Sequence, residues 1–212
     1  YQNALARRAL DSDAGSPGPS GEAGVAHLTP GIWSTVNALH IRKVISEFSH
    51  ELLLRPRLEH VEDEWGSYVL ATDSPGVEYR FRAQLLNLDH WHVDTASIER
   101  FLDGKRAPLD SVCFMLEIRE TVGMNPAMLP TYMEELTSTL SSSAYKHANQ
   151  RFNAAELAHA DFQDVESGMT EGHPCFVANN GRIGFDVADH ERYAPEAGSD
   201  LRLLWLAGHR TR

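Results

Sequence analysis

Residues 171–185 read Glu-Gly-His-Pro-Cys-Phe-Val-Ala-Asn-Asn-Gly-Arg-Ile-Gly-Phe, which places a histidine, two asparagines and an arginine beside three glycines. Glycines let a backbone approach a ligand closely. His173 and Arg182 carry donors that suit an anionic group such as a phosphate, and the guanidinium offers a planar fork of N–H groups. The residues therefore indicate a candidate anion site. A surface hairpin with a satisfied histidine is the alternative.

The same segment makes a prediction about the backbone. Asn179-Asn180-Gly181 is a tight-turn signal of the kind that reverses a hairpin, so residues 176–178 and 182–185 are predicted to be short strands. Residues 201–206 are almost continuously apolar and are typical of a buried strand that needs neighbours. These segments predict the start of a second antiparallel sheet. We expect the chain to be a fragment cut at both ends.

Upstream of this segment, the first strong signal is a helix start at Thr29-Pro30. Threonine is a good N-cap and proline fits the first helical position. Apolar residues at helical spacing follow until Arg55-Pro56, which is predicted to end the helix. Lys43 is among the charged residues that mark its exposed face, and His40 reads as a surface or satisfied histidine.

The pattern then changes to one of strands. From Trp65 to Val93, apolar residues recur with a period near two, and Asp103-Gly104 is a hairpin signal. Three to five short antiparallel strands are predicted. Further helices are expected from Asp110, from Asn125 to Pro130, from Asn153 and from Asp161, with hydroxyl residues 138–143 closing the second of these. Because strands and helices are segregated, the fold class is α+β: N-terminal helices packed with a small antiparallel meander, followed by helices and the second sheet.

Composition excludes several classes of function. The chain has 19 basic and 30 acidic residues, a formal charge of −11, which argues against a nucleic-acid partner. No apolar run approaches the roughly 20 residues that span a bilayer, so no membrane partner is expected. Cys113 and Cys175 form neither a disulfide framework nor a CxxC site, which favours free thiols in a reducing cytoplasm.

Other constellations compete with the anion site. His90 and His92 would share one face of a strand and offer two zinc ligands, but a structural zinc site needs four, so a packed strand face is preferred to a metal-dependent hydrolase. A Cys175 nucleophile is disfavoured because its histidine partner is usually remote in sequence. Glu166 and Glu171 are read as solvated. With no complete generic catalytic motif, a non-catalytic α+β binding module remains the alternative to an enzyme.

Residues 172–185 resemble the His-Pro signature of the IucA/IucC family, the siderophore synthetases that work without a nonribosomal peptide template. The sequence His-Pro-Cys-Phe-Val-Ala-Asn-Asn-Gly-Arg is similar to the corresponding segment in the branch that includes desferrioxamine and alcaligin synthetases. The resemblance extends collinearly through residues 26–51, 88–93, 136–146 and 193–210. It implies a flexible segment at residues 1–25, a thumb-like N-terminal domain at 26–160 and the truncated start of an ATP-binding domain at 161–212.

The resemblance also implies an activity. Family members activate a carboxylate with Mg-ATP as an acyl-adenylate and condense it with an amine, so the expected cofactors are ATP and Mg²⁺ and the expected partners are small carboxylates and amines. The branch implies N-hydroxy-N-succinyl diamines joined by amide bonds into a hydroxamate siderophore. The metal ligands are expected outside this fragment. The full-length protein is a candidate cytoplasmic homodimer.

Site residues follow from the same resemblance. His173 and Arg182 are the implied catalytic residues, contacting the nucleotide phosphates. The other implied ATP-binding residues are Thr170, Gly172, Asn180, Ser138, Thr139 and Lys146. Many relatives carry a second His-Pro and a lysine between the first histidine and the arginine, whereas this chain has Phe-Val and Asn-Asn there. The charge facing the phosphates must then come from Arg182 and from elsewhere.

Overall fold

The computed structural model describes residues 25–150, 152–169, 171–173, 175–200 and 203–208. The segment predicted to be flexible, residues 1–25, lies outside this part of the chain except for its last residue, and Thr170 lies outside it as well. The chain divides into two compact units, residues 27–184 and residues 1–26 with 185–212. The candidate segment up to Gly184 belongs to the first unit.

Helix α2 (Pro30–His50) begins where the sequence predicts. The Thr29 side chain accepts a hydrogen bond from the backbone N–H of Ile32 at 3.3 Å, and Pro30 occupies the first turn. The predicted end at Arg55-Pro56 is wrong, because the helix stops at His50. Leu52 adopts a positive φ of 60°, and the N–H groups of the next two residues both bond to the carbonyl of Phe48. The chain thus reverses before the proline is reached.

A six-stranded antiparallel sheet follows among the described residues, in the order β1-β2-β3-β5-β6, with β4 also paired to β3. The α+β fold class is confirmed, and the sheet has one strand more than the upper limit predicted. The missed strand is β1, whose six residues are all exposed, so it carries no apolar alternation to detect. The strands are β1 (Arg57–Glu62), β2 (Trp65–Ala71), β3 (Val77–Leu85), β4 (Trp91–Val93), β5 (Glu99–Leu102) and β6 (Lys105–Ala107).

The hairpin predicted at Asp103-Gly104 is confirmed. Both residues have positive φ, 50° and 75°, as the turn between β5 and β6 requires, and Leu102 pairs with Lys105. The run through His90 and His92 is only partly a strand. Residues 87–89 form the short 3-10 helix η2, and β4 starts after His90.

The remaining helices of this unit are α3 (Ser111–Glu117), α4 (Leu129–Ala148), α5 (Ala154–Leu157) and α6 (Phe162–Gly168). Their predicted caps are confirmed where the side chain accepts from the first turn: Asp110 for α3, Asn153 for α5 and Asp161 for α6. Helix α4 runs through the hydroxyl residues to Ala148, so these residues lie within the helix and do not close it.

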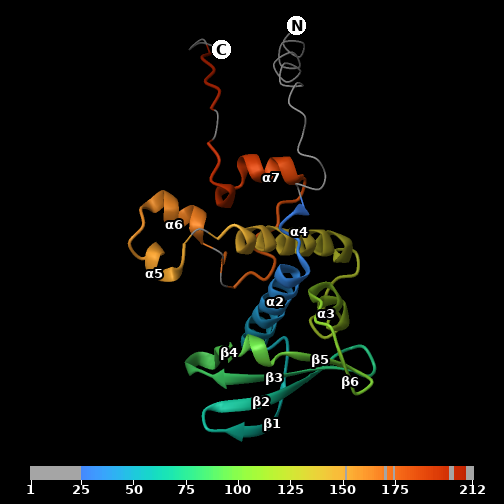
Figure 1. Ribbon diagram of the computed structural model, residues 1–212. Helices are drawn as coiled ribbons and strands as arrows, with labels where there is room; N and C mark the ends of the chain where they lie inside the picture. Colours follow the sequence, from blue (N-terminus) through green and yellow to red (C-terminus); the bar gives the residue numbers. More distant parts are fainter. Residues whose placement is uncertain (1–24, 151, 170, 174, 201–202, 209–212) are drawn as a thin grey trace. The chain divides into compact units, whose positions relative to one another are not determined.

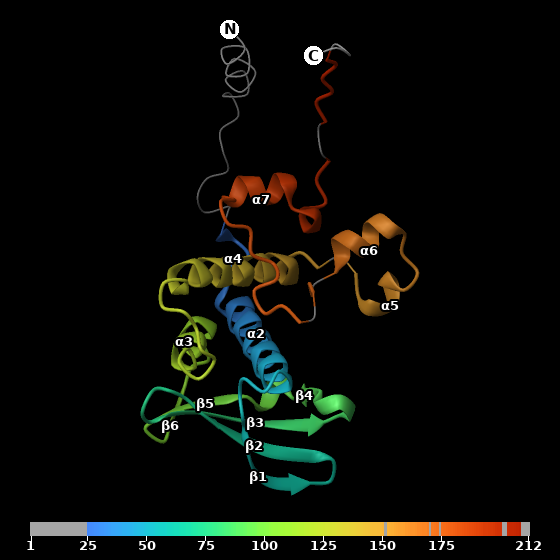
Figure 2. The ribbon, with the colours of Figure 1, turned by 180° about the vertical axis from the view of Figure 1, so that it is seen from behind.

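The hydrophobic core lies between the sheet and helices α2, α3 and α4. Figures 1 and 2 show α2 extending from the sheet toward α4, which crosses it. Ile41 and Ile45 of α2, Phe114 of α3 and Leu140 of α4 are almost fully buried. The same cluster includes Val177, which anchors the candidate segment to the core.

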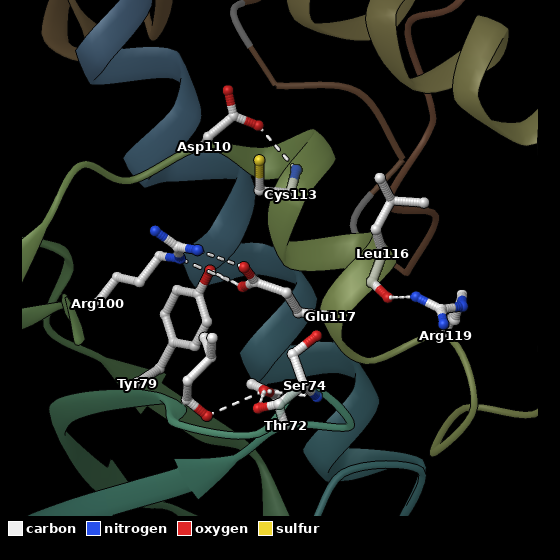
Figure 3. A network of polar contacts seen from close by, with 10 residues as sticks. Thr72, Ser74, Tyr79, Arg100, Asp110, Cys113, Leu116, Glu117 and Arg119 are labelled. Atoms are coloured by element: carbon white, nitrogen blue, oxygen red, sulfur yellow. Dashed lines mark hydrogen bonds and ion pairs between the residues drawn. The ribbon is translucent and has the colours of Figure 1, made fainter. Parts of the chain in front are cut away.

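A buried ion pair ties the sheet to α3 (Figure 3). The guanidinium of Arg100 on β5 donates to the carboxylate of Glu117 on α3 at 2.5 Å, and the Tyr79 hydroxyl on β3 donates to it at 2.7 Å. Burial, together with the Glu117 carboxylate, raises the pKa of Tyr79. The tyrosine therefore stays protonated and acts as a hydrogen-bond donor to the carboxylate.

The predicted second sheet is not found in the described residues. Residues 176–185 form two turns joined by irregular backbone, and residues 203–208 have no regular structure. The backbone and side chains around Gly181 bond to α4 instead of forming a hairpin ladder. Residues 201 and 202 lie outside the described part. The helix α7 (Val187–Tyr193), capped by Asp186, was not predicted.

Candidate functional site

Helix α4 presents one polar stripe to the turn that ends the candidate segment. The Ser138 hydroxyl accepts a hydrogen bond from the backbone N–H of Arg182 at 2.8 Å. The Lys146 ammonium donates to Asn180 Oδ1 at 3.0 Å, and Asn180 Nδ2 donates to the Ser143 hydroxyl at 3.4 Å. Four residues that the family resemblance implied are therefore in contact as two pairs, Ser138 with Arg182 and Lys146 with Asn180, and more than 30 positions separate the members of each pair in sequence.

Two glycines permit this close packing. A Cβ at Gly181 would lie 2.7 Å from the carbonyl oxygen of Glu135 and 3.1 Å from the Thr139 hydroxyl. A Cβ at Gly172 would lie 2.7 Å from Asn179 Nδ2 and 3.0 Å from Asn180 Oδ1. Only glycine fits either position without displacing its neighbours. The predicted residues Gly172 and Thr139 thus both adjoin the 179–182 turn.

His173 is exposed, and its ring is held by local contacts. Its Nδ1 accepts a hydrogen bond from the backbone N–H of Cys175 at 3.3 Å, and its ring lies 4.7 Å from that of Phe176. An imidazole nitrogen that accepts carries no proton, so the neutral ring has its proton on Nε2. The side chain therefore presents an N–H donor on the side away from Cys175.

Arg182 and His173 are connected through the two asparagines between them. Asn179 Nδ2 donates to the carbonyl oxygen of His173 at 2.9 Å, and the Arg182 guanidinium donates to the carbonyl oxygen of Asn180 at 3.3 Å. Arg182 is half-buried. These bonds fold the segment back on itself, so that the histidine and the arginine belong to one compact loop.

A small cavity of about 30 Å³ lies between this loop and helices α2 and α4. It has room for about one water molecule. Of the predicted residues, Thr139 and Asn180 line it, and His173 and Arg182 do not. Two buried polar atoms at its wall, His40 Nδ1 and Thr139 Oγ1, have no hydrogen-bond partner among the described residues. A nucleotide is far too large for this cavity and would have to bind on the exposed side of the loop.

Helix α2 contributes two residues that the sequence did not identify as part of a site. Lys43 was read as a residue of the exposed face, which is wrong: it is 8% exposed, and its ammonium donates to the carbonyl oxygen of His173 at 2.8 Å. His40, one helical turn earlier, is 7% exposed and bonds through Nε2 to the carbonyl oxygen of Val177 at 3.1 Å. The sequence offered one sign that His40 and Lys43 act together: a spacing of three residues, which places both side chains on the same face of the helix.

The environment of His40 disfavours its charged form. Burial lowers its pKa from 6.5 to about 4, the bond to Val177 opposes this, and the nearby Lys43 ammonium adds to the lowering. Because Val177 offers a carbonyl oxygen, Nε2 must donate, which leaves Nδ1 unprotonated at the cavity wall. His40 is therefore a neutral structural donor beneath the loop.

The histidine pair, the Cys175 thiol and the two glutamates weighed as alternatives form no metal or nucleophile site among the described residues. His90 stacks on His50 at 4.3 Å between ring centroids, and His92 lies 5.6 Å from Trp65. No group of three or more potential metal ligands of the His, Cys, Asp and Glu type occurs in the described part of the chain. Cys175 meets His173 through its backbone N–H, and Glu171 lies 4.0 Å from Arg42. In the same residues, no helix is both long and apolar enough to span a bilayer.

Comparisons with known proteins agree on one family. The IucA / IucC family model matches residues 161–212. Putrebactin synthase from Shewanella sp. (strain MR-4) is 42% identical over 182 residues, which are 86% of this chain and 29% of that protein. The chain spans less than a third of the length of the curated relatives it matches.

Solved structures of this family share the fold. Aerobactin synthetase IucC from Klebsiella pneumoniae aligns with a TM-score of 0.66 at 24% identity, over 78% of this chain and 29% of that one. ATP-bound aerobactin synthetase IucA from the same organism aligns with a TM-score of 0.56 at 13% identity, over 77% and 29%. The 182 residues matched to putrebactin synthase are too many to lie within residues 26–160 or within residues 161–212 alone. The family-model match at residues 161–212, the 42% identity to putrebactin synthase and the shared fold together relate this chain to the IucA/IucC family.

Proposed function

We propose that this chain is the N-terminal part of a siderophore synthetase that uses Mg-ATP to activate a carboxylate and joins it to an amine. The support is twofold. Its relatives are named as siderophore synthetases, and the chain spans 29% of the length of putrebactin synthase. The observation that carries the proposal is the loop of residues 171–182, which carries the His173 imidazole and the Arg182 guanidinium and is bonded to α4 through Ser138 and the Lys146 ammonium.

These groups fit the phosphates of a nucleotide by their chemistry. His173 offers Nε2–H from an exposed ring, Arg182 offers a guanidinium, and Lys146 offsets negative charge close to Asn180. A structural relative was solved with ATP bound, which makes a nucleotide the reasonable anion. In the proposed reaction the substrate carboxylate attacks the α-phosphate, pyrophosphate leaves, and the amine then displaces AMP from the acyl group.

The loop residues would act by position and charge. Donors held in place before the reaction stabilise charge that develops on phosphate oxygens without further rearrangement. The hydrogen bond that the Arg182 N–H donates to Ser138 and the one that Lys146 donates to Asn180 hold the 180–182 turn, and the bond that the Cys175 N–H donates sets the tautomer of His173. Gly172 and Thr139 would shape the approach, and Thr170 is retained in the proposal from the family resemblance alone.

The proposal includes Mg²⁺ as the ion that accompanies ATP. Mg²⁺ is usually held by one or two carboxylates together with substrate phosphates. The described residues contain no cluster of potential ligands that singles out such carboxylates. We therefore assign the metal to the complete protein and no role to it in this chain.

The substrates are proposed from the branch. We infer N-hydroxy-N-succinyl diamines, derived from cadaverine or putrescine, as the units joined into a hydroxamate siderophore. Incubating the complete protein with each unit and Mg-ATP, with product masses read by mass spectrometry, tests this. The 212-residue chain alone should form no product. We further propose that the complete protein acts in the cytoplasm, since both cysteines are free thiols, and that it forms a homodimer.

Nucleotide binding itself is tested by isothermal titration of Mg-ATP into the complete protein. Arg182→Ala should weaken binding by about tenfold, the worth of one charge-assisted contact. Arg106→Ala is the matched control, because its side chain is 71% exposed on β6. Equal affinities for the wild type and Arg182→Ala would remove Arg182 from the site. A complete protein that binds no Mg-ATP would favour the non-catalytic binding module.

A further inference from the structure

Two side chains of α2 reach the backbone of the candidate loop from beneath. The Lys43 ammonium donates to the carbonyl oxygen of His173 at 2.8 Å, and His40 Nε2 donates to the carbonyl oxygen of Val177 at 3.1 Å. Lys43 and His173 are 130 residues apart in sequence, and His40 and Val177 are 137 residues apart. Together with the bonds that Ser138, Ser143 and Lys146 of α4 make, these two contacts join residues 27–160 to the His-Pro segment within the unit of residues 27–184.

The carbonyl oxygen of His173 receives two donors. Besides the Lys43 ammonium, the side-chain amide of Asn179 donates to it at 2.9 Å. A carbonyl oxygen has two lone pairs, so both are used. This fixes the backbone at His173 from one side, while the bond from the Cys175 N–H to Nδ1 fixes the ring. The remaining ring proton, on Nε2, is thereby given a defined direction.

Lysine is a costly choice for this position if its role is only to fill space. Lys43 is 8% exposed, and burial lowers its pKa, while the Glu171 and Glu47 carboxylates oppose that change. A methionine has nearly the same length and would cover the core without desolvating an ammonium. The donor to His173 is what a methionine would lack.

We propose that Lys43 is a positioning residue for His173, which holds the imidazole in the orientation needed to bind the nucleotide phosphates. This inference rests on the function proposed above. Lys43 touches no substrate and acts through the histidine. Its positive charge also lies beneath a loop whose own sequence carries a cation only at Arg182, and so adds to the local attraction for an anion.

The test uses the complete protein with three substitutions. Lys43→Met removes the donor, Lys43→Arg keeps a charged donor, and Lys105→Met is the control, since Lys105 is exposed on β6. Mg-ATP affinity is measured by titration and stability by urea unfolding. The reactivity of His173 toward diethyl pyrocarbonate is measured by peptide mass spectrometry, with the exposed His60 as internal reference.

The expected pattern separates positioning from a structural role. Lys43→Met should raise the Kd for Mg-ATP about tenfold, the worth of one charge-assisted hydrogen bond, while its urea midpoint stays equal or rises. Lys43→Arg should recover most of the affinity, and Lys105→Met should match the wild type. Wild-type affinity in Lys43→Met overturns the proposal. So does a loss of stability that parallels the loss of affinity, because that marks a structural lysine.

The chemical readout keeps this inference separate from the proposed function. If the wild type binds no Mg-ATP, the proposed function fails, and the reactivity of His173 still decides the role of Lys43. A changed rate in Lys43→Met, with His60 unchanged, supports positioning. An unchanged rate refutes it.

Discussion

Acidification should destabilise this protein through His40, the histidine buried beneath the candidate loop. Burial lowers the pKa of His40 from 6.5 to about 4, so the folded protein prefers the neutral ring. The stabilisation that depends on the neutral ring is fully present above pH 6.5 and is lost as the pH falls through about 4. Over that window the unfolded chain binds a proton that the folded chain resists.

The magnitude follows from the same pKa values. The difference between 6.5 and about 4, at about 1.36 kcal/mol per pH unit, corresponds to about 3 kcal/mol of unfolding free energy. The groups around the cavity offer a protonated His40 ring little compensation for its charge. Among the described residues, His40 Nδ1 has no hydrogen-bond partner, the cavity is lined by Lys43 and His147, and Glu171 is the one carboxylate that lines it. Protonated His40 would meet more positive than negative charge there.

Urea unfolding at a series of pH values between about 7.5 and 4 measures the effect. Carboxylates also titrate in this range, so the informative quantity is the difference between wild type and His40→Gln. Glutamine is neutral throughout and keeps an N–H donor for the Val177 carbonyl. The variant should lose about 3 kcal/mol less than wild type on acidification. His60→Gln, at an exposed histidine of β1, should follow the wild type. Parallel losses in wild type and His40→Gln would refute the reasoning.

Two further predictions concern the buried ion pair and the glycine contact. Arg100→Met leaves the Glu117 carboxylate, whose side chain is 10% exposed, without its cation, and should cost about 3 kcal/mol in urea unfolding. Arg106→Met, at an exposed arginine, should change stability by less than about 0.5 kcal/mol, and equal effects of the two would contradict a special role for the buried pair. Gly181→Ala forces a Cβ to within 2.7 Å of an α4 carbonyl and should lower the urea midpoint and weaken Mg-ATP binding in the complete protein. Gly31→Ala, where nothing lies within 4 Å of the added Cβ, should be neutral or stabilising, and a Gly181→Ala protein as stable as it would show that the loop can move away from α4.

Features governed by near neighbours were predictable from the sequence. The helix caps at Thr29, Asp110, Asn153 and Asp161 each involve a bond across three residues, and the Asp103-Gly104 hairpin needs only its own turn. The α+β class followed from the order of these elements. The site residues on α4 were named from a family resemblance, because nothing local relates Ser138 to Arg182.

Features that depend on distant contacts required the tertiary structure. Asn179-Asn180-Gly181 is a hairpin signal by itself, but α4 takes up the polar groups of the turn, and the backbone around it pairs with no strand among the described residues. Lys43 looks like a surface lysine until the loop covers it. The sequence alone thus determined where four helices begin and where the β5–β6 hairpin turns. The fold decided which polar groups are buried together, because burial and long-range hydrogen bonds form only when residues more than 100 positions apart are packed against each other.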